Sequence, residues 1–218
     1  MKIGIIGAGH IGGNLARRLT AAGHDVAIAN SRGPETLADV ASKTGAKPVR
    51  AEDATRDKDL VIVTIPEKSV PELPKDLFAS VKKDTVVVDT GNYYPQRDGK
   101  IEPILDGETE SRWVSEQLGR PVVKAFNTIY ARNIVDRARP AGDTSRLALP
   151  VAGDDLHAKQ VVMQVIDEIG FDSVDAGGLD DSWRQQPGTP VYGAELDVSG
   201  VQRALADAPH ERPKEFRA

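Results

Sequence analysis

The sequence predicts an α/β fold with a doubly wound, mainly parallel β-sheet. Three observations support this fold class. Strand and helix patterns alternate along most of the 218 residues, and residues 59–66 form an almost continuous apolar run, which is typical of a strand covered on both faces. A short apolar strand at residues 2–6 also runs directly into a glycine-rich turn. We therefore expect one α/β domain over residues 1–180, with a short C-terminal extension over residues 181–218.

The glycine-rich turn follows the first strand and opens a helix. Gly7, Gly9 and Gly12 have the G-x-G-x-x-G spacing of a Rossmann-type dinucleotide-binding unit. The first glycine makes a tight turn, the second lets the backbone approach a pyrophosphate, and the third allows the helix to pack closely on the strand. Because the first amides of the helix have no intrahelical partner, they can also hold an anion. The alternative is a structural turn in an unrelated α/β protein.

Two further residues of this turn are candidate cofactor contacts. Ile11 begins the apolar stripe of the helix, which ends near Gly23. His10 occupies a variable position of the turn, where it either approaches the cofactor or caps the helix and faces water, and both interpretations stay open. The sequence thus predicts cofactor contacts from Gly7, Gly9, His10, Ile11 and Gly12.

The second strand, residues 25–30, leads into the segment Asn30, Ser31 and Arg32. In this fold an Asp or Glu at that position hydrogen-bonds the ribose hydroxyls and favours NAD. A hydroxyl and a guanidinium follow the strand here instead, and both suit a 2′-phosphate. We therefore expect NADP(H), bound through these three residues. The alternative is that Arg32 is an ordinary solvated loop cation.

The rest of the chain continues the alternation of helices and strands. Pro34 starts a helix that ends at Gly45. The fourth strand, at residues 59–66, ends in Thr64, Ile65 and Pro66, where we expect backbone contacts to the cofactor and an apolar wall. The other predicted strands are residues 47–50, 85–89, 121–126, 147–152 and 172–175, and the other predicted helices are residues 111–118, 155–169 and 195–207.

Composition narrows the function classes. The formal net charge of −5 disfavours a general nucleic-acid binder. No apolar run is long enough to span a bilayer, and the N-terminal apolar stretch has the length of a strand rather than of a signal peptide. The chain has no cysteine, and its four histidines are scattered without metal-ligand spacing. We expect a cytoplasmic protein with no metal site, no nucleic-acid partner and no membrane partner.

Six segments carry a resemblance to a known family: residues 7–12 (GAGHIG), 30–32 (NSR), 64–66 (TIP), 122–129 (VVKAFNTI), 150–155 (PVAGDD) and 174–179 (VDAGGL). In this order the chain resembles NADP-dependent oxidoreductases that exchange hydride with an 8-hydroxy-5-deazaflavin coenzyme. It is also similar to the reductase domain of six-transmembrane metalloreductases. The resemblance implies direct hydride transfer between NADP(H) and a planar ring such as a deazaflavin or flavin, without a nucleophile or a dedicated proton shuttle.

The nicotinamide pocket is expected where the strand at residues 121–126 ends. Asn127, Thr128 and Ile129 follow that strand, and ligands bind at the carboxyl ends of parallel strands. The alternative for Asn127 is the N-cap of a following helix. Three aromatic residues are candidates for stacking on a flat acceptor, or else simply pack in the protein: Tyr93, Trp183 and Tyr192.

Two other dehydrogenase classes fit less well. Two-domain hydroxyacid dehydrogenases and imine reductases resemble the N-terminal half but add a large helical domain, for which the sequence after Pro150 is too short. Short-chain dehydrogenases use a Tyr-x-x-x-Lys pair, and no tyrosine here has a lysine four residues later. We expect an NADPH-dependent reductase of a small planar acceptor, working as a homodimer. The alternative is an NADP(H)-binding sensor or scaffold module without turnover.

Overall fold

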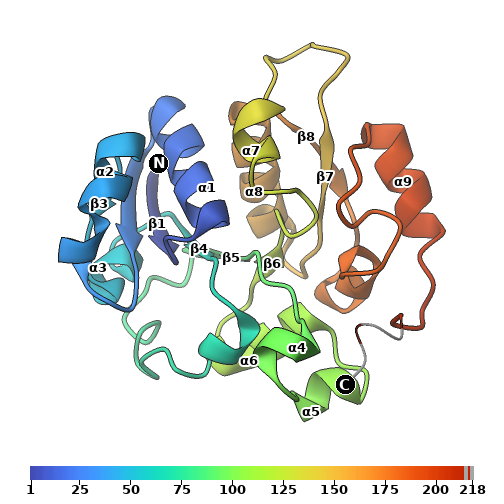
Figure 1. Ribbon diagram of the computed structural model, residues 1–218, viewed down its shortest axis with the longest axis horizontal. Helices are drawn as coiled ribbons and strands as arrows, with labels where there is room; N and C mark the ends of the chain where they lie inside the picture. Colours follow the sequence, from blue (N-terminus) through green and yellow to red (C-terminus); the bar gives the residue numbers. More distant parts are fainter. Residues whose placement is uncertain (214–215, 217–218) are drawn as a thin grey trace.

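The main sheet has six parallel strands in the order β3-β2-β1-β4-β5-β6 (Figure 1). The computed structural model describes residues 1–213 and 216. Because the chain returns from β3 at one edge to place β4 beside β1, the strand order reverses there and a crevice forms at the carboxyl ends of the strands. The strands are β1 (Lys2–Ile6), β2 (Asp25–Ala29), β3 (Lys47–Pro48), β4 (Leu60–Val63), β5 (Val86–Asp89) and β6 (Val123–Lys124).

Both faces of this sheet are buried, as β4 illustrates. Ile62 packs in one apolar cluster with Leu15 and Val165, whereas its neighbours Val61 and Val63 pack in a second cluster. Since alternate residues of a strand point to opposite faces, the apolar run is covered on both sides, as the sequence predicts. The helices are α1 (His10–Ala21), α2 (Ala38–Thr44), α3 (Ala51–Thr55), α4 (Pro95–Asp98), α5 (Glu102–Leu105), α6 (Glu110–Leu118), α7 (Asn133–Asp136), α8 (Leu156–Glu168) and α9 (Val198–Ala206), with short 3₁₀ helices η1 (Pro34–Leu37), η2 (Glu67–Ser69) and η3 (Leu179–Gln185).

The last two strands, β7 (Ala148–Val151) and β8 (Asp172–Asp175), form a separate parallel pair. The pair meets β6 through an isolated antiparallel bridge, in which the amides of Lys124 and Ala152 donate to each other's carbonyls at 2.8 and 3.0 Å. The predicted doubly wound, mainly parallel fold is confirmed, and these two strands add to it as a separate parallel pair. The chain leaves β6 after two residues, and Phe126 then adopts a φ of 61°, a left-handed backbone that is unusual for a bulky side chain.

Helix α9 packs on the second sheet, beside β7 (Figure 1). Its residues Val201, Ala204 and Leu205 are buried in one cluster with Ala148 and Val174, which confirms the helix predicted there. The predicted boundary at residue 180 falls inside η3. The short helices α3, α4, α5 and η3 are not predicted by the sequence, because each is too short to show an apolar period. In the described part of the chain, no helix combines the length and hydropathy that a bilayer span requires.

Candidate functional site

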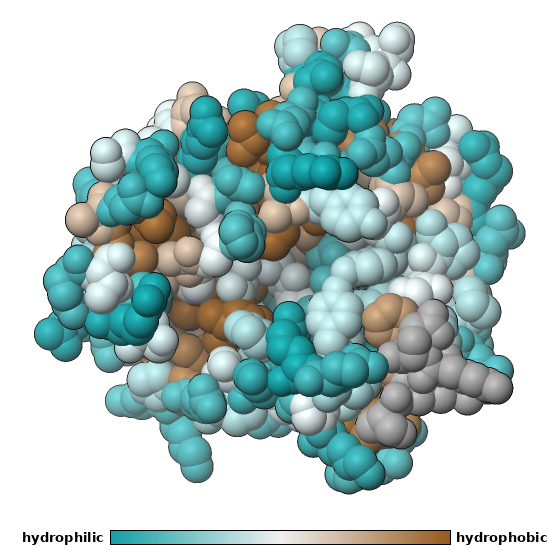
Figure 2. All heavy atoms as spheres, viewed as in Figure 1, coloured by the Kyte–Doolittle hydropathy of each residue, from teal (hydrophilic) through white to brown (hydrophobic). Residues whose placement is uncertain are grey.

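A cleft of about 320 Å³ opens at the carboxyl ends of β1, β4, β5 and β6. Its walls come from the glycine turn, the end of β4, the segment after β5, the segment after β6 and Tyr192. Figure 2 shows apolar atoms in the hollow at the centre of this face, bordered by hydrophilic residues. This is the place where a doubly wound sheet binds its ligand.

The glycine turn has the geometry that a dinucleotide requires. Gly7 has a φ of 113°, and a methyl group there would lie 2.2 Å from the Thr64 carbonyl oxygen. A methyl group at Gly12 would lie 2.0 Å from the Gly7 carbonyl oxygen, whereas a methyl group at Gly9 would meet no atom within 4 Å. Gly9 is also the N-cap of α1, with no side chain bonded to the first amides of the helix. The open approach therefore lies where a phosphate would bind.

The other residues predicted near the phosphates and the ring also border the cleft. His10 is the first residue of α1 rather than its cap, and it lines the cleft together with Ile11. The end of β4 contributes Thr64, Ile65 and Pro66 to the same wall. The sequence thus identified one continuous side of the cleft, from the helix N-terminus to the β4 end.

At the end of β2, the Asn30 side chain is hydrogen-bonded within the turn, whereas the next two side chains are exposed. Asn30 Oδ1 accepts a hydrogen bond from the Arg32 amide at 3.0 Å, and Asn30 Nδ2 donates to Thr36 Oγ1 at 2.9 Å. The Asn30 side chain therefore shapes the turn. Ser31 and Arg32 are both exposed at its tip, where their side chains are accessible to a nucleotide.

Asn127 lies in the cleft wall, but its side-chain amide is already engaged. Its Nδ2 donates to Asn92 Oδ1 at 3.0 Å and to the Gln185 carbonyl at 2.6 Å, while its Oδ1 accepts from Gln185 Nε2 at 2.9 Å. The capping alternative is wrong, because α7 begins at Asn133 with Arg132 as its N-cap. Asn127 therefore ties the segment after β5 to η3, and this amide network shapes the wall.

The two residues after Asn127 are placed differently. Ile129 lines the cleft. Thr128 is buried, and its carbonyl accepts a hydrogen bond from the Gly193 amide at 2.9 Å. Thr128 thus connects the β6 end to the C-terminal extension instead of lining the cleft.

Three tyrosines surround the open side of the cleft: Tyr94, Tyr130 and Tyr192. The hydroxyls of Tyr94 and Tyr192 hydrogen-bond each other, and burial raises the pKa of the Tyr94 phenol above its usual range. Tyr192 is one of the predicted aromatic candidates. Tyr94 was missed, because the sequence does not show which of the adjacent residues Tyr93 and Tyr94 faces outward.

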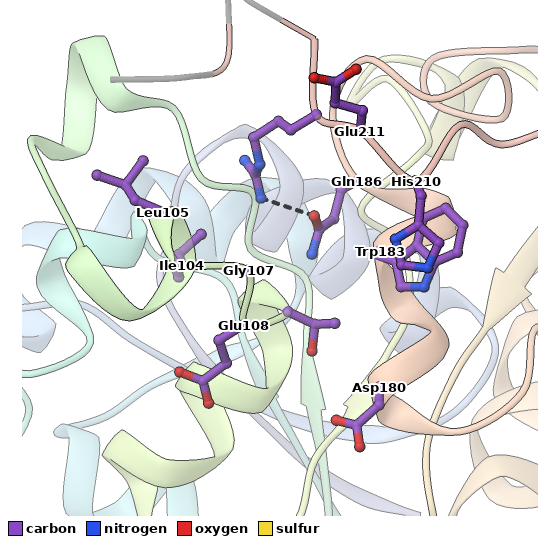
Figure 3. A pocket seen from close by; sticks show the side chains of 11 residues that line it. Ile104, Leu105, Gly107, Glu108, Asp180, Trp183, Gln186, His210 and Glu211 are labelled. Carbon is purple, nitrogen blue, oxygen red and sulfur yellow. Dashed lines mark hydrogen bonds between the residues drawn. The ribbon is translucent and has the colours of Figure 1, made fainter.

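The other two aromatic candidates lie elsewhere. Tyr93 is fully buried and donates to the Gly99 carbonyl at 2.7 Å. Trp183 lines a second cavity of about 790 Å³, bordered by the connection between α5 and α6, by η3 and by the segment after α9 (Figure 3). There the centre of its ring lies 4.1 Å from the centre of the His210 ring. Tyr93 and Trp183 therefore do not converge with Asn127.

Beneath the cleft lies a cluster of buried charges that sequence reasoning did not identify. Lys124 Nζ donates to Asp89 Oδ2 at 3.2 Å and to the Gly91 carbonyl at 2.7 Å, and it lies 3.8 Å from Glu110 Oε2. Arg212 contacts the other oxygen of Glu110 at 2.9 Å. Burial opposes the charge of Lys124, but the nearby carboxylates outweigh it and raise its pKa. Lys124 is therefore a charged group in the protein interior.

Glu67, the first residue of η2, also belongs to this cluster. Its side chain is fully buried, and neither carboxyl oxygen has a hydrogen-bond partner among the described residues. Burial raises the pKa of Glu67 well above its usual range; Asp89, Glu110 and Asp98 add to this effect, whereas Lys124 opposes it. Glu67 therefore keeps its proton to a higher pH than an ordinary glutamate, and it lies against Gly91 of the cleft wall.

The raised pKa of Glu67 predicts a pH-dependent effect of Glu67→Gln on stability. The unfolded chain loses this proton above about pH 4.3, whereas the folded protein retains it, so the wild type loses stability as the pH rises through this window. Glutamine cannot ionise in either state. We therefore expect Glu67→Gln to unfold with nearly the wild-type free energy near pH 4 and to gain stability relative to the wild type as the pH rises above the unfolded-state pKa of about 4.3. Urea unfolding across this range measures the difference.

Glu52→Gln, at an exposed position on α3, is the control for this comparison. We expect its difference from the wild type to stay constant with pH. A constant difference for Glu67→Gln as well would contradict a raised pKa of Glu67.

Comparisons with known proteins place this geometry among oxidoreductases. Residues 2–93 match a family described as "NADP oxidoreductase coenzyme F420-dependent". A hypothetical protein, SMa0349, from Sinorhizobium meliloti has 37% identity and a structure with a TM-score of 0.75, covering 90% of this chain and 95% of that one. The structure of a putative F420-dependent NADP reductase from Arthrobacter sp. FB24 has the same fold, with a TM-score of 0.65 at 24% identity, covering 82% and 85%.

Two curated proteins are also similar in sequence. The putative protein YjhV of Escherichia coli is 44% identical over 73 residues, which are 33% of this chain and 53% of that protein. The metalloreductase STEAP3 of Rattus norvegicus is 27% identical over 179 residues, which are 82% of this chain and 34% of that protein. The match thus spans about half the length of the first relative and a third of the second.

Proposed function

Because this chain belongs to the family of coenzyme F420-dependent NADP oxidoreductases, we propose that it transfers a hydride between NADP(H) and a planar acceptor of the deazaflavin or flavin type. The observation that carries the proposal is the cleft, which joins the glycine turn to a wall of tyrosines. When bound, the nicotinamide supplies the hydride. The chain supplies binding, orientation and exclusion of water.

The adenosine end of the cofactor would be held by the glycine turn and the β2 end. The first amides of α1 point toward the pyrophosphate position, and no acidic side chain lies in the first turn of that helix to repel it. Ser31 and Arg32 offer a hydroxyl and a guanidinium for the 2′-phosphate. These contacts favour NADP(H) over NAD.

The nicotinamide end would lie between Ile65 and Pro66 on one side and the Asn127 wall on the other. The amide network of Asn92, Asn127 and Gln185 makes that wall rigid. Hydride transfer between two rings requires near-contact distance more than acid–base groups. A rigid wall therefore serves this reaction directly.

The acceptor would enter from the side bordered by Tyr94, Tyr130 and Tyr192. Tyrosine rings offer a flat apolar surface with a polar edge, which suits a ring system that carries carbonyl and amide groups. The Arg97 guanidinium lies 4.9 Å from the centre of the Tyr94 ring and also borders the cleft. Asp98 already pairs with this guanidinium at 2.8 and 2.9 Å, so Arg97 would offer hydrogen-bond donors to an acceptor rather than a free positive charge. We also propose that the protein works in the cytoplasm as a homodimer; sedimentation of the purified protein tests the dimer.

Turnover tests the proposed reaction. NADPH oxidation is followed at the nicotinamide absorbance with oxidised deazaflavin, FMN, FAD and riboflavin as acceptors. We expect steady oxidation with at least one of them and much slower oxidation of NADH. Tight NADPH binding without turnover on any acceptor would instead support a sensor or scaffold module.

Arg32→Ala tests cofactor choice separately from turnover. Since a hydrogen bond to a charged group contributes about 1.5–3 kcal/mol, we expect NADPH affinity to fall by about 10- to 100-fold, with NADH affinity unchanged. Calorimetric titration measures both. Arg203→Ala, at an exposed position on α9, should leave both affinities unchanged. An equal loss of NADPH and NADH affinity in Arg32→Ala would contradict the 2′-phosphate site.

A further inference from the structure

Residue 91 is glycine for reasons of space rather than of backbone conformation. Its φ lies outside the left-handed region that favours glycine. A methyl group at this position, however, would lie 2.4 Å from Glu67 Oε1 and 3.0 Å from Asp89 Oδ1. Any larger side chain would therefore have to displace two buried carboxyl groups or the peptide itself.

Two charged side chains hold the Gly91 peptide from behind. The Gly91 amide donates to Asp89 Oδ1 at 2.8 Å, and the Gly91 carbonyl accepts from Lys124 Nζ at 2.7 Å. Lys124 and Asp89 also pair with each other at 3.2 Å, and Ser111 Oγ donates to Asp89 Oδ2 at 2.6 Å. All of these groups are buried, so water and salt do not weaken the contacts that hold the Gly91 peptide.

Glu67 completes the support without any hydrogen bond of its own. Its carboxyl group is fully buried, lies against Gly91, and has no hydrogen-bond partner among the described residues. A polar group buried without a partner lowers stability. A contribution to stability therefore does not explain why a glutamate stands at position 67. Its position directly behind the wall of the cleft offers an explanation.

The front of the same peptide faces the cleft. Thr90, Gly91 and Asn92 all line it, between the end of β4, to which the Thr90 amide donates a hydrogen bond at 3.1 Å, and Asn127, whose side chain bonds Asn92. We propose that Gly91 is a specificity-determining contact of the nicotinamide ring, and that Lys124, Asp89 and Glu67 are positioning residues that hold its peptide against that ring. This inference rests on the proposed function for the location of the ring. It adds the requirement that the wall stand at a fixed distance from the hydride donor.

A double-mutant cycle of Gly91→Ala and Glu67→Ala tests the inference by binding alone. Adenosine 2′,5′-bisphosphate, which lacks the nicotinamide half, serves as the reference ligand beside NADPH. Gly91→Ala pushes the wall into the cleft, and Glu67→Ala removes its support. We expect each single change to weaken NADPH binding by about tenfold, or about 1.4 kcal/mol. The affinity for the bisphosphate should stay within about twofold of the wild-type value.

The double variant provides the decisive comparison, because the added methyl group then occupies space vacated by the carboxyl. We expect its NADPH affinity to recover to within about threefold of the wild type. If the two changes merely damaged the structure, their losses of affinity would add in the double variant, and the binding of both ligands would be weakened. Gly13→Ala, where a methyl group meets no atom within 4 Å, is the matched control and should bind both ligands as the wild type does.

Glu67→Asp keeps the inference testable if Gly91→Ala does not fold. The shorter side chain withdraws from Gly91 without creating a clash, and we expect a severalfold weaker affinity for NADPH with unchanged affinity for the bisphosphate. Wild-type affinity for NADPH in Glu67→Asp, or parallel losses for both ligands, would overturn the role of Gly91. Absence of turnover with normal NADPH binding would count against the proposed acceptor chemistry only.

Discussion

Replacing Lys124 by Met is expected to lower the free energy of unfolding by about 3–5 kcal/mol. Methionine fills much of the same volume, but it removes the cation that the buried Asp89 and Glu110 share, so that Glu110 keeps only its contact with Arg212. The Gly91 carbonyl also loses its donor. Breaking one partner out of a buried ion pair is costly because the remaining charge cannot be solvated. Urea unfolding at neutral pH measures the loss.

Lys159→Met is the matched control for this prediction. Lys159 is also a buried lysine, and its Nζ contacts Asp175 at 2.7 Å and the Gly177 carbonyl at 3.2 Å. The Asp175 side chain, however, is 51% exposed, so water can solvate its charge when the lysine is removed. We expect a loss of about 1–2 kcal/mol. Equal losses for the two lysine variants would show that the charge cluster beneath the cleft contributes no more to the free energy of unfolding than a partly exposed ion pair does.

Gly12→Ala is expected to abolish most of the affinity for NADP(H). The added methyl group would lie 2.0 Å from the Gly7 carbonyl oxygen and 2.8 Å from Thr64 Cγ2, so α1 must move away from the turn. Its first amides would then be misaligned with the phosphates, and two hydrogen bonds of about 1.5 kcal/mol or more each would be lost. We expect NADPH affinity to fall by about 100-fold or more, together with a stability loss of about 1–3 kcal/mol from overpacking.

Gly13→Ala provides the comparison one residue further along the same helix. Its methyl group would meet no atom within 4 Å, and alanine favours a helix over glycine by about 1 kcal/mol. We expect unchanged NADPH affinity and a small gain in thermal stability. If both alanine variants retained the cofactor, α1 would not be the phosphate-binding helix.

The glycine-turn side of the cleft was predictable because its determinants are local. Gly7, Gly9 and Gly12 lie within six consecutive residues, and the strand and helix that they connect have clear apolar patterns. The β2 end is equally local, since Asn30 to Arg32 follow their strand directly. Short-range sequence spacing is sufficient wherever a site is built from one strand, one turn and one helix.

The side of the cleft at the ends of β5 and β6 was only partly predictable because several distant segments build it. Asn127 was placed from the end of its strand, but its amide partners Asn92 and Gln185 could not be inferred. The same holds for Glu67 and Lys124, whose burial depends on how β4, β5 and β6 align. The sequence also left open whether Tyr93 and Trp183 stack on an acceptor or simply pack in the protein, because their surroundings depend on distant segments: Tyr93 is buried, and Trp183 lies against His210.

The Tyr94–Tyr192 hydrogen bond joins two partly buried residues that are 98 positions apart in the chain. Segments held by few buried contacts open most easily in the native state. The amides around this tyrosine pair are therefore expected to exchange their hydrogens faster than those of the β1–α1 turn. The molecule thereby combines a slowly exchanging glycine turn and a fixed Asn127 network with a pair of tyrosines that can separate to admit and release a second ring.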